Sequence, residues 1–243
     1  MSKTSIIIPT YNGKELLKDC LYTISQHTRE PVEIIVVDNG STDGTADFCR
    51  QERITFISLP ANRGFPAACN AGLKLATGDA LLLLNNDVLV TENWLGHMLA
   101  CLNSAPEIGI VGPMSNYVSG RQQIREPFTN LEEMSARYSH QDPGKWQSVQ
   151  RIVGLCFLFK RELLERVGLL DERYSPGHYE DDDYCYRARL AGYRLMIAGD
   201  VFIFHHGSAS FSRENEARVR ELIERNREQF VAKWQVDPAV FQI

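Results

Sequence analysis

An apolar run that stops abruptly at three polar residues, GDALLLLNND at positions 78–87, constrains this chain more than any other feature. The five consecutive apolar residues Ala80–Leu84 predict a strand buried on both faces, as in a parallel sheet covered by helices. Polar side chains at the carboxyl end of such a strand lie in the crevice where open α/β sheets bind ligands. Asp87 is therefore a candidate to bind a hard cation beside a ligand's phosphates. A turn after the strand explains the same residues, because Asn and Asp favour turns.

Short apolar runs alternate with amphipathic segments through the first half of the chain. This alternation predicts βαβ units and a single Rossmann-like, mostly parallel sheet with helices on both faces, an α/β fold. The expected strands are Ser5–Ile8, Glu33–Val37, Thr55–Leu59, Ala80–Leu84 and Ile108–Val111. The expected helices are Lys14–Gln26, Thr45–Gln51, Pro66–Leu75 and Asn93–Asn103.

The second half is less regular. Residues 113–148 lose periodicity and gain Pro, Gly, Ser, Gln and Arg, so we expect a long functional loop there. The elements expected after it are a buried run Ile152–Phe159, helices Arg161–Val167 and Tyr184–Ala191, strands Arg194–Ile197 and Val201–Phe204, and a charged C-terminal helix Glu214–Trp234. We expect one domain over 1–243, made of a regular first half (1–112), a less regular second half (113–211) and the C-terminal helix (212–243).

Charge and cysteine usage exclude several classes of function. A formal net charge of −5 argues against nucleic-acid binding, which requires a basic face. The six cysteines lack a CxxC pair, which favours free thiols over a zinc site or disulfides. The start of the chain predicts no signal peptide, and no apolar stretch approaches the roughly 20 residues of a spanning helix. We expect a cytoplasmic protein, compatible with peripheral association at the inner face of the membrane.

Polar residues also follow the first two predicted strands. Pro9 ends the first strand, and Tyr11 offers a flat ring on which a nucleobase can rest, although a plain turn explains both. Asp38 and Asn39 follow the second strand and are candidates to bind a ribose or a base edge. Arg63 precedes a helix rich in small residues and is a candidate to bind a diphosphate, although tight packing of that helix on the sheet explains the small residues equally well.

An acidic cluster, Tyr179–Asp183, and a histidine pair, His205–His206, follow in the second half. Negative charge is favoured at a helix N-terminus, and capping explains part of the cluster. Four acids exceed what capping requires, and a carboxylate beside an acceptor hydroxyl can act as a general base. The histidines are either structural or ligands of a cation.

Six segments in order, IIPTYN, VVDNGSTDGT, NRGFPAACNAGL, GDALLLLNNDV, GHYEDDDYCYRARLAGYRL and HHGSASF, make the chain resemble the family 2 glycosyltransferases, which are inverting enzymes with the GT-A fold. The resemblance implies that Asn85–Asp87 takes the place of the family's metal-binding Asp-x-Asp, here with one acid and two amides. It implies that Asp181 is the general base and that Asp183 braces the site. His205, five positions before Ser210, matches a histidine that approaches the metal or diphosphate.

The resemblance implies that residues 1–112 are the nucleotide-binding half and residues 113–211 the acceptor and catalytic half, and it gives a complete expected site. The donor nucleotide is expected to contact Pro9, Tyr11, Asn12, Asp38, Asn39, Arg63, Asn70 and Asn86. Mn²⁺ or Mg²⁺ is expected at Asp87 and His205, and acceptor support from Glu180, Asp183 and Arg161. The implied donors are UDP-, dTDP- or GDP-sugars, and the implied acceptors are glycans, lipid-linked oligosaccharides or proteins.

Two other functions use the same fold. A sugar-nucleotide pyrophosphorylase needs a glycine-rich, arginine-bearing loop after the first strand, where this chain has Pro9–Gly13. A non-catalytic domain that binds a sugar nucleotide or a partner protein is compatible with the reduced metal motif, whereas the acidic cluster favours an enzyme. Hydrolysis of the donor separates the enzyme from the non-catalytic domain, which would bind the donor without cleaving it.

Overall fold

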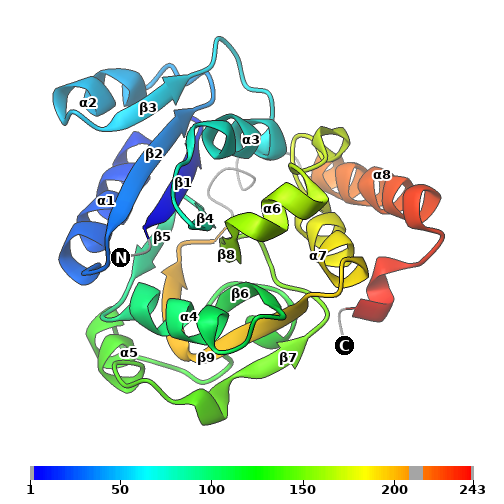
Figure 1. The fold of residues 1–243 in the computed structure, drawn as a ribbon. Helices are drawn as coiled ribbons and strands as arrows, with labels where there is room; N and C mark the ends of the chain where they lie inside the picture. Colours follow the sequence, from blue (N-terminus) through cyan, green and yellow to red (C-terminus); the bar gives the residue numbers. More distant parts are fainter. Residues whose placement is uncertain (1–2, 208–215, 242–243) are drawn as a thin grey trace.

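One mixed sheet forms the centre of the computed structural model, which describes residues 3–207 and 216–241 (Figure 1). Its strands are β1 (Thr4–Thr10), β2 (Val32–Asp38), β3 (Thr55–Ser58), β4 (Ala80–Leu84), β5 (Val88–Val90), β6 (Ile108–Ser115), β7 (Gln147–Val149), β8 (Cys156–Lys160) and β9 (Arg194–His205). In this part of the chain the strand order is β3-β2-β1-β4-β8-β6-β9-β5, and β7 also pairs with β9. All five strands expected in the first half are confirmed, with ends shifted by a few residues.

The direction of each strand decides which residues lie together at one edge of the sheet. Strands β3, β2, β1 and β4 run parallel, so their carboxyl ends meet at one edge. Strand β8 runs antiparallel to β4, with Cys156 opposite Leu84 and Lys160 opposite Ala80. The start of β8 therefore lies at the edge where these carboxyl ends meet, and its end lies at the opposite edge.

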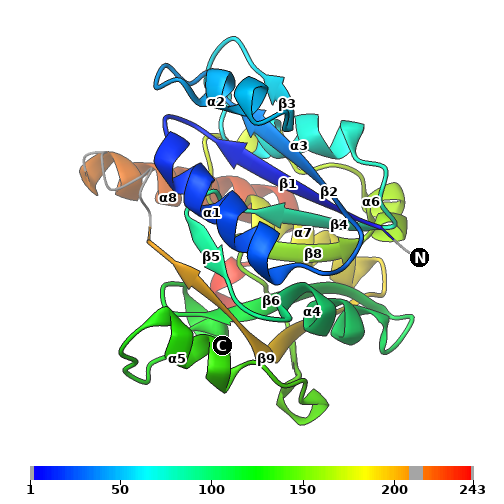
Figure 2. The ribbon, with the colours of Figure 1, turned by 90° about the vertical axis from the view of Figure 1, so that its left-hand side faces the viewer.

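Helices cover both faces of the sheet. They are α1 (Lys14–His27), α2 (Thr45–Gln51), α3 (Phe65–Leu75), α4 (Trp94–Asn103), α5 (Leu131–Arg137), α6 (Arg161–Val167), α7 (Glu180–Leu190) and α8 (Glu216–Trp234). Figure 2 shows α1 in front of β1, β2 and β4. Leu82 and Leu84 pack in the apolar cluster formed with α1 and α4, whereas Leu81 and Leu83 pack in the cluster formed with α3, α6 and α7. Strand β4 is thus buried on both faces, as its sequence predicts.

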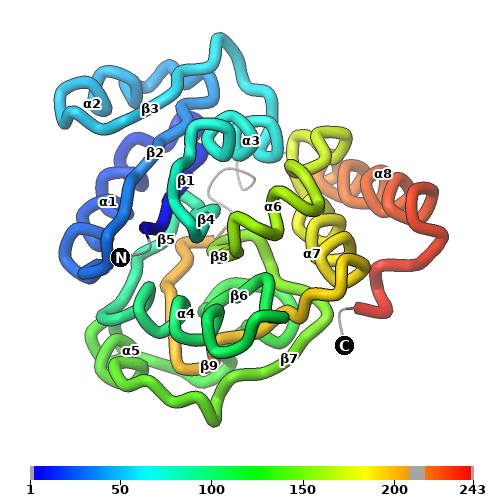
Figure 3. The backbone as a smooth tube through the Cα atoms, viewed as in Figure 1, coloured from blue at the N-terminus to red at the C-terminus, as the bar shows by residue number. Residues whose placement is uncertain are grey.

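Two expectations about the second half are corrected. The expected loop 113–148 contains the end of β6, helix α5 and most of β7, and Figure 3 traces this path. Helix α5 begins because the Asn130 side chain accepts a hydrogen bond from the Glu133 amide, while the Glu133 carboxylate accepts one from Thr129. Local capping, rather than apolar periodicity, defines this helix. The two strands expected over 194–204 are one strand, β9, which pairs with β6 across a register shift.

The remaining expectations concern thiols and the C-terminal helix. All six cysteines are free thiols, as predicted, and the structure buries each of them. Helix α8 begins at Glu216 among the described residues, and Glu214 and Ser210 lie outside them. None of the helices in the described ranges is both long enough and apolar enough to cross a membrane.

Candidate active site

A cavity of about 900 Å³ opens at the carboxyl edge of β1 and β4. Its wall contains Pro9 near the end of β1 and Tyr11 just after it, Asn85–Asp87 after β4, His205 at the end of β9, and Glu180–Asp182 at the start of α7. A cavity of this size lies within the range of small-molecule sites, about 300–1,000 Å³. The structure therefore brings together side chains that are far apart in the sequence.

The amide side chains on the β1–β4 side shape the wall by binding neighbouring segments. Asn86 donates from Nδ2 to Thr10 Oγ1 at 2.8 Å. Asn39 donates from Nδ2 to Gly64 O at 3.2 Å and accepts from the Arg63 amide at 2.9 Å. Tyr11 is 42% exposed, so its ring is accessible to a ligand.

Asp87 and His205 form a pair on this side of the cavity. Asp87 Oδ1 lies 3.2 Å from His205 Nε2, and both side chains are buried. His205 Nδ1 lies 2.7 Å from Tyr117 O, and because a carbonyl only accepts, Nδ1 is the donor there. Burial lowers the pKa of His205, but the hydrogen bond to Asp87 and its charge outweigh burial and raise the pKa.

This pair fits a divalent cation through its donor set. With Nδ1 donating to Tyr117, the buried Nε2 faces a carboxylate oxygen, and two acceptors this close require a proton or a cation between them. Orientation of the imidazole by a backbone carbonyl is the usual outer-shell arrangement of histidine ligands. Within residues 3–207 and 216–241, no group of three or more His, Cys, Asp or Glu side chains is placed to hold a metal ion. Two protein ligands leave coordination positions of a cation open to substrate or water oxygens.

The acidic cluster begins helix α7 on the opposite side of the cavity. Asp181 Oδ2 accepts from the Gly154 amide at 2.9 Å, and Oδ1 accepts from the Asp182 amide at 2.9 Å. Arg151 lies between the acids, with Nε 2.6 Å from Asp182 Oδ1 and a terminal nitrogen 3.9 Å from Asp181 Oδ2. Two backbone amides therefore orient the Asp181 carboxylate, and the Arg151 guanidinium forms a longer ion pair with it.

Burial of several acids together changes their protonation. Burial, followed by the charge of Asp181, raises the pKa of Asp182 to about 7, although Arg151 opposes the shift. The same two causes raise the pKa of Glu180 well above its usual value. The raised pKa values of Glu180 and Asp182 reduce the number of adjacent negative charges that this buried cluster carries near neutral pH.

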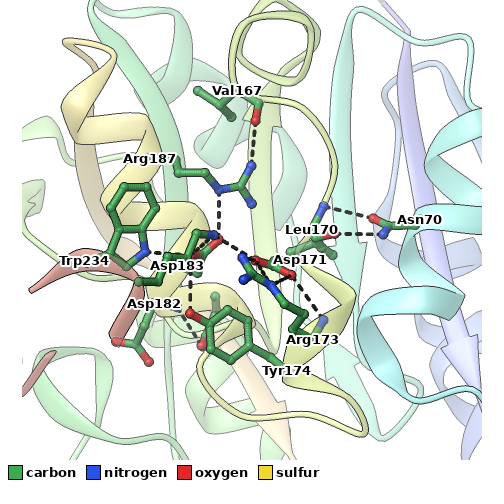
Figure 4. A network of polar contacts seen from close by, with 12 residues as sticks. Asn70, Val167, Leu170, Asp171, Arg173, Tyr174, Asp182, Asp183, Arg187 and Trp234 are labelled. Atoms are coloured by element: carbon green, nitrogen blue, oxygen red, sulfur yellow. Dashed lines mark hydrogen bonds and ion pairs between the residues drawn. The ribbon is translucent and has the colours of Figure 1, made fainter. Parts of the chain in front are cut away.

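Asp183 faces away from the cavity and connects α7 with α8 (Figure 4). Its carboxylate is fully buried and accepts from Lys233 Nζ at 2.6 Å, Trp234 Nε1 at 2.7 Å and Arg187 Nε at 2.8 Å. These contacts support a bracing role for Asp183, as the sequence predicts, and they support no contact with an acceptor.

Four expected donor contacts lie outside the cavity wall: Asn12, Asp38, Arg63 and, as described below, Asn70. Asn12 accepts from the Thr42 amide at 2.8 Å, and Asp38 accepts from the Ser41 amide at 3.0 Å, so both hold the loop after β2. The Arg63 side chain is 62% exposed and lies 3.7 Å from Glu172. Their side chains shape or flank the segments that form the wall.

Two expected site residues are corrected by their contacts. Asn70 is 2% exposed; it donates to Leu170 O at 2.9 Å and accepts from the Leu170 amide at 3.0 Å, so it ties α3 to the segment before α7. Arg161 donates to the Gly78 and Ala76 carbonyls, at 2.6 and 2.9 Å. It follows β8 at the edge of the sheet opposite the cavity, because β8 runs antiparallel to β4. Both side chains satisfy backbone groups rather than a ligand.

The variant Asn70→Ala tests the corrected role of Asn70. Loss of the side chain leaves the buried Leu170 amide and carbonyl without their partner, which costs about 1–3 kcal/mol of unfolding free energy. Urea unfolding should measure this loss, while the affinity for UDP stays within about twofold of the parent. A large loss of UDP affinity with unchanged stability would restore Asn70 to the donor site.

Sequence reasoning missed Arg151 and Gly154, which orient the acids. Arg151 lies immediately before the predicted run Ile152–Phe159, in a stretch without periodicity. A single basic residue there carries no local signal, because its partners Asp181 and Asp182 are 30 and 31 positions away. Gly154 contributes its backbone amide, which any residue except proline possesses.

Among curated proteins, the chain is similar to several bacterial proteins. It is 29% identical to an uncharacterized protein of Sinorhizobium fredii, over 97% of this chain and 28% of that protein. It is 28% identical to an O-antigen biosynthesis protein of Myxococcus xanthus, over 86% of this chain and 18% of that protein. It is 28% identical to an N-acetylglucosaminyl-diphospho-decaprenol L-rhamnosyltransferase of Mycobacterium tuberculosis, over 86% of this chain and 78% of that enzyme. The chain thus spans less than a third of the first two relatives.

Solved structures match the fold. A mannosyltransferase from Pyrobaculum calidifontis in complex with GDP-Man and Mn²⁺ matches with a TM-score of 0.64 and 25% identity, over 84% of this chain and 56% of that one. Staphylococcus aureus TarS in complex with UDP-GlcNAc matches with a TM-score of 0.63 and 18% identity, over 88% and 61%. These are GT-A glycosyltransferases, and the expected fold class is confirmed.

The family model described as glycosyl transferase family 2 matches residues 5–168, well over half of the 243 residues. The matched range contains β1 and β4, whose ends line the cavity, together with Asp87, Arg151 and Gly154. On this match, the chain belongs to glycosyl transferase family 2.

Proposed function

We propose that this chain transfers a sugar, with inversion, from a nucleotide diphosphate-sugar to an acceptor hydroxyl. One observation carries the proposal: the Asp87–His205 pair and the oriented carboxylate of Asp181 line the same cavity. Transfer requires one group beside the leaving diphosphate and another beside the attacking hydroxyl. The solved structures that match the fold support the donor class, because they contain GDP-Man or UDP-GlcNAc.

The donor nucleotide is proposed to lie along the β1–β4 side of the cavity. Tyr11 presents an exposed ring for the base, and Pro9 and Asn39 complete that wall. Asp87 and His205 would hold Mn²⁺ or Mg²⁺, with the substrate's phosphates as further ligands. When bound, such a cation offsets the negative charge that develops on a departing diphosphate. The Mn²⁺ in the mannosyltransferase complex supports this choice of metal.

Asp181 is proposed to be the general base. The acceptor oxygen forms a bond to the anomeric carbon, the bond from that carbon to the diphosphate oxygen breaks, and the hydroxyl proton moves to Asp181. The Gly154 amide and Arg151 keep the carboxylate in place during this step. An oxocarbenium-like transition state is expected, as in other glycosidic chemistry.

A panel of sugar nucleotides tests the donor site. UDP-, dTDP- and GDP-sugars are added with and without Mn²⁺, and thermal unfolding is followed. A ligand present at about 100 times its Kd should add about 2.7 kcal/mol of stability. We expect one nucleotide class to stabilise the chain and Mn²⁺ to increase the effect. Binding without hydrolysis or transfer of the sugar would favour the non-catalytic alternative.

The variant Asp87→Ala tests the proposed cation site. We expect it to lose the part of the nucleotide-induced thermal shift that depends on Mn²⁺, because His205 alone is a weak ligand for this cation. The matched control is Asp47→Ala, which removes an exposed carboxylate on α2. An unchanged Mn²⁺ response in Asp87→Ala would rule out this residue as a ligand.

A further inference from the structure

Helix α8 contacts the segment that leads into the acidic cluster. This segment, 174–179, precedes Glu180 directly, and its residues Pro176–Tyr179 line the cavity. His178 and Tyr179 have φ angles of 70° and 75°, a region that non-glycine residues rarely adopt. Such a conformation persists only where surrounding contacts determine it. The contacts of this segment therefore decide where α7 begins.

Asn226 of α8 makes the most extensive of these contacts. Its side chain is fully buried, and Nδ2 donates to the carbonyls of Tyr174, Gly177 and His178 at 2.9, 2.8 and 3.0 Å. Its Oδ1 accepts from Arg225 Nε at 3.1 Å. The two N–H bonds of a single amide group thus contact three backbone carbonyls within one short segment, so that one N–H is shared between two of them.

Neighbouring residues of α8 extend this contact along the helix (Figure 1). Ile223 lines the cavity, and the Phe230 ring lies 6.4 Å from the Tyr179 ring. Residues 223, 226 and 230 share one face, because they are three and four positions apart. Arg225 also donates to Ser175 O at 2.6 Å. On the other side of the segment, the Phe65 amide donates to Pro176 O at 2.8 Å. The segment is held between α8 and the loop that precedes α3.

We propose that Asn226 is a positioning residue for sugar transfer: it holds segment 174–179, and thereby the start of α7 with Asp181, in the reactive arrangement. This inference rests on the proposed function, because it assigns Asn226 an effect on the base of that reaction. Asn226 acts through the backbone and does not need to touch either substrate. Through Asn226, helix α8 then helps to position the general base, in addition to packing against α7.

Two variants remove the three hydrogen bonds. Asn226→Asp keeps the shape of the side chain but loses the amide donors, and Asn226→Ala loses them without burying a charge. The matched control is Arg227→Gln, since Arg227 is the next residue of α8 and its side chain pairs with Glu224 and Asp237 rather than with the backbone carbonyls of the segment. Each protein is examined by hydrogen exchange, by binding of UDP, dTDP and GDP with Mn²⁺, and by steady-state transfer or donor hydrolysis.

We expect exchange to become at least tenfold faster in peptides covering 174–182 in both variants, and to stay unchanged in peptides from β1 and β4. Nucleotide affinity should change less than threefold, while kcat falls about 10–100-fold, the scale of a misplaced reacting group. The control should resemble the parent in all three measurements.

Other outcomes overturn the inference or locate its failure. Unchanged exchange over 174–182 would show that Asn226 does not hold the segment. Faster exchange with an unchanged kcat would show that the position of the segment does not govern transfer. A parent that binds nucleotide but neither hydrolyses nor transfers sugar would remove the proposed function, while the exchange result would still decide whether Asn226 holds the segment.

Discussion

Asp181→Asn should lower the rate of sugar transfer about 10²–10⁴-fold, the contribution of a positioned general base. The amide has the shape of the carboxylate but cannot accept the hydroxyl proton. The Asn Oδ1 can accept from only one of the two backbone amides, Gly154 or Asp182, that now bind separate carboxylate oxygens of Asp181. Initial rates with a saturating donor and acceptor measure the effect.

Two comparisons make the Asp181→Asn result specific. The dissociation constants of UDP, dTDP and GDP with Mn²⁺ should stay within about twofold of the parent, since the nucleotide is proposed to lie on the β1–β4 side. The matched control Asp47→Asn changes an exposed acid on α2 and should leave the rate unchanged. A variant that transfers sugar as fast as the parent would remove Asp181 from the mechanism.

Asp183→Ala should have the largest effect on stability, about 3–5 kcal/mol, the usual cost of breaking a buried ion pair from one side. The Asp183 carboxylate is fully buried and pairs with Arg187 and Lys233, at 2.8 and 2.6 Å. Without it the Arg187 guanidinium, whose side chain is 14% exposed, keeps its charge without a carboxylate partner. Chemical denaturation measures the free energy of unfolding.

The control for this prediction is again an acid of α2. Asp47→Ala breaks an exposed pair with Arg50, and exposed pairs contribute little to stability. The double variant Asp183→Ala, Arg187→Leu should recover part of the lost stability, because it removes the uncompensated charge. A loss in Asp183→Ala no larger than that in Asp47→Ala would contradict the bracing role.

The position of the cavity was predictable from sequence because the rule behind it is local. Residues 78–87 identify a buried strand and the polar turn that ends it, and the same pattern recurs after β1 and β2. Carboxyl ends of parallel strands meet at one edge, so Tyr11, Asn39 and Asp87 were expected to lie close together, and all three line the cavity. Local hydrophobic pattern and strand direction are enough to predict where the cavity lies.

Which way each polar side chain points depended on contacts between distant segments. Asn70 binds Leu170, 100 positions away, and Asn226 binds Tyr174, 52 positions away. Arg161 lies at the far edge because β8 turned out to run antiparallel to β4, a direction that its apolar run does not encode. Sequence by itself determined the layered fold and the edge that carries the site, because helical and strand periodicity are properties of neighbouring residues. Only the tertiary structure decided which side chains face the cavity, because a buried polar group must point to whichever partner packing brings within hydrogen-bond distance.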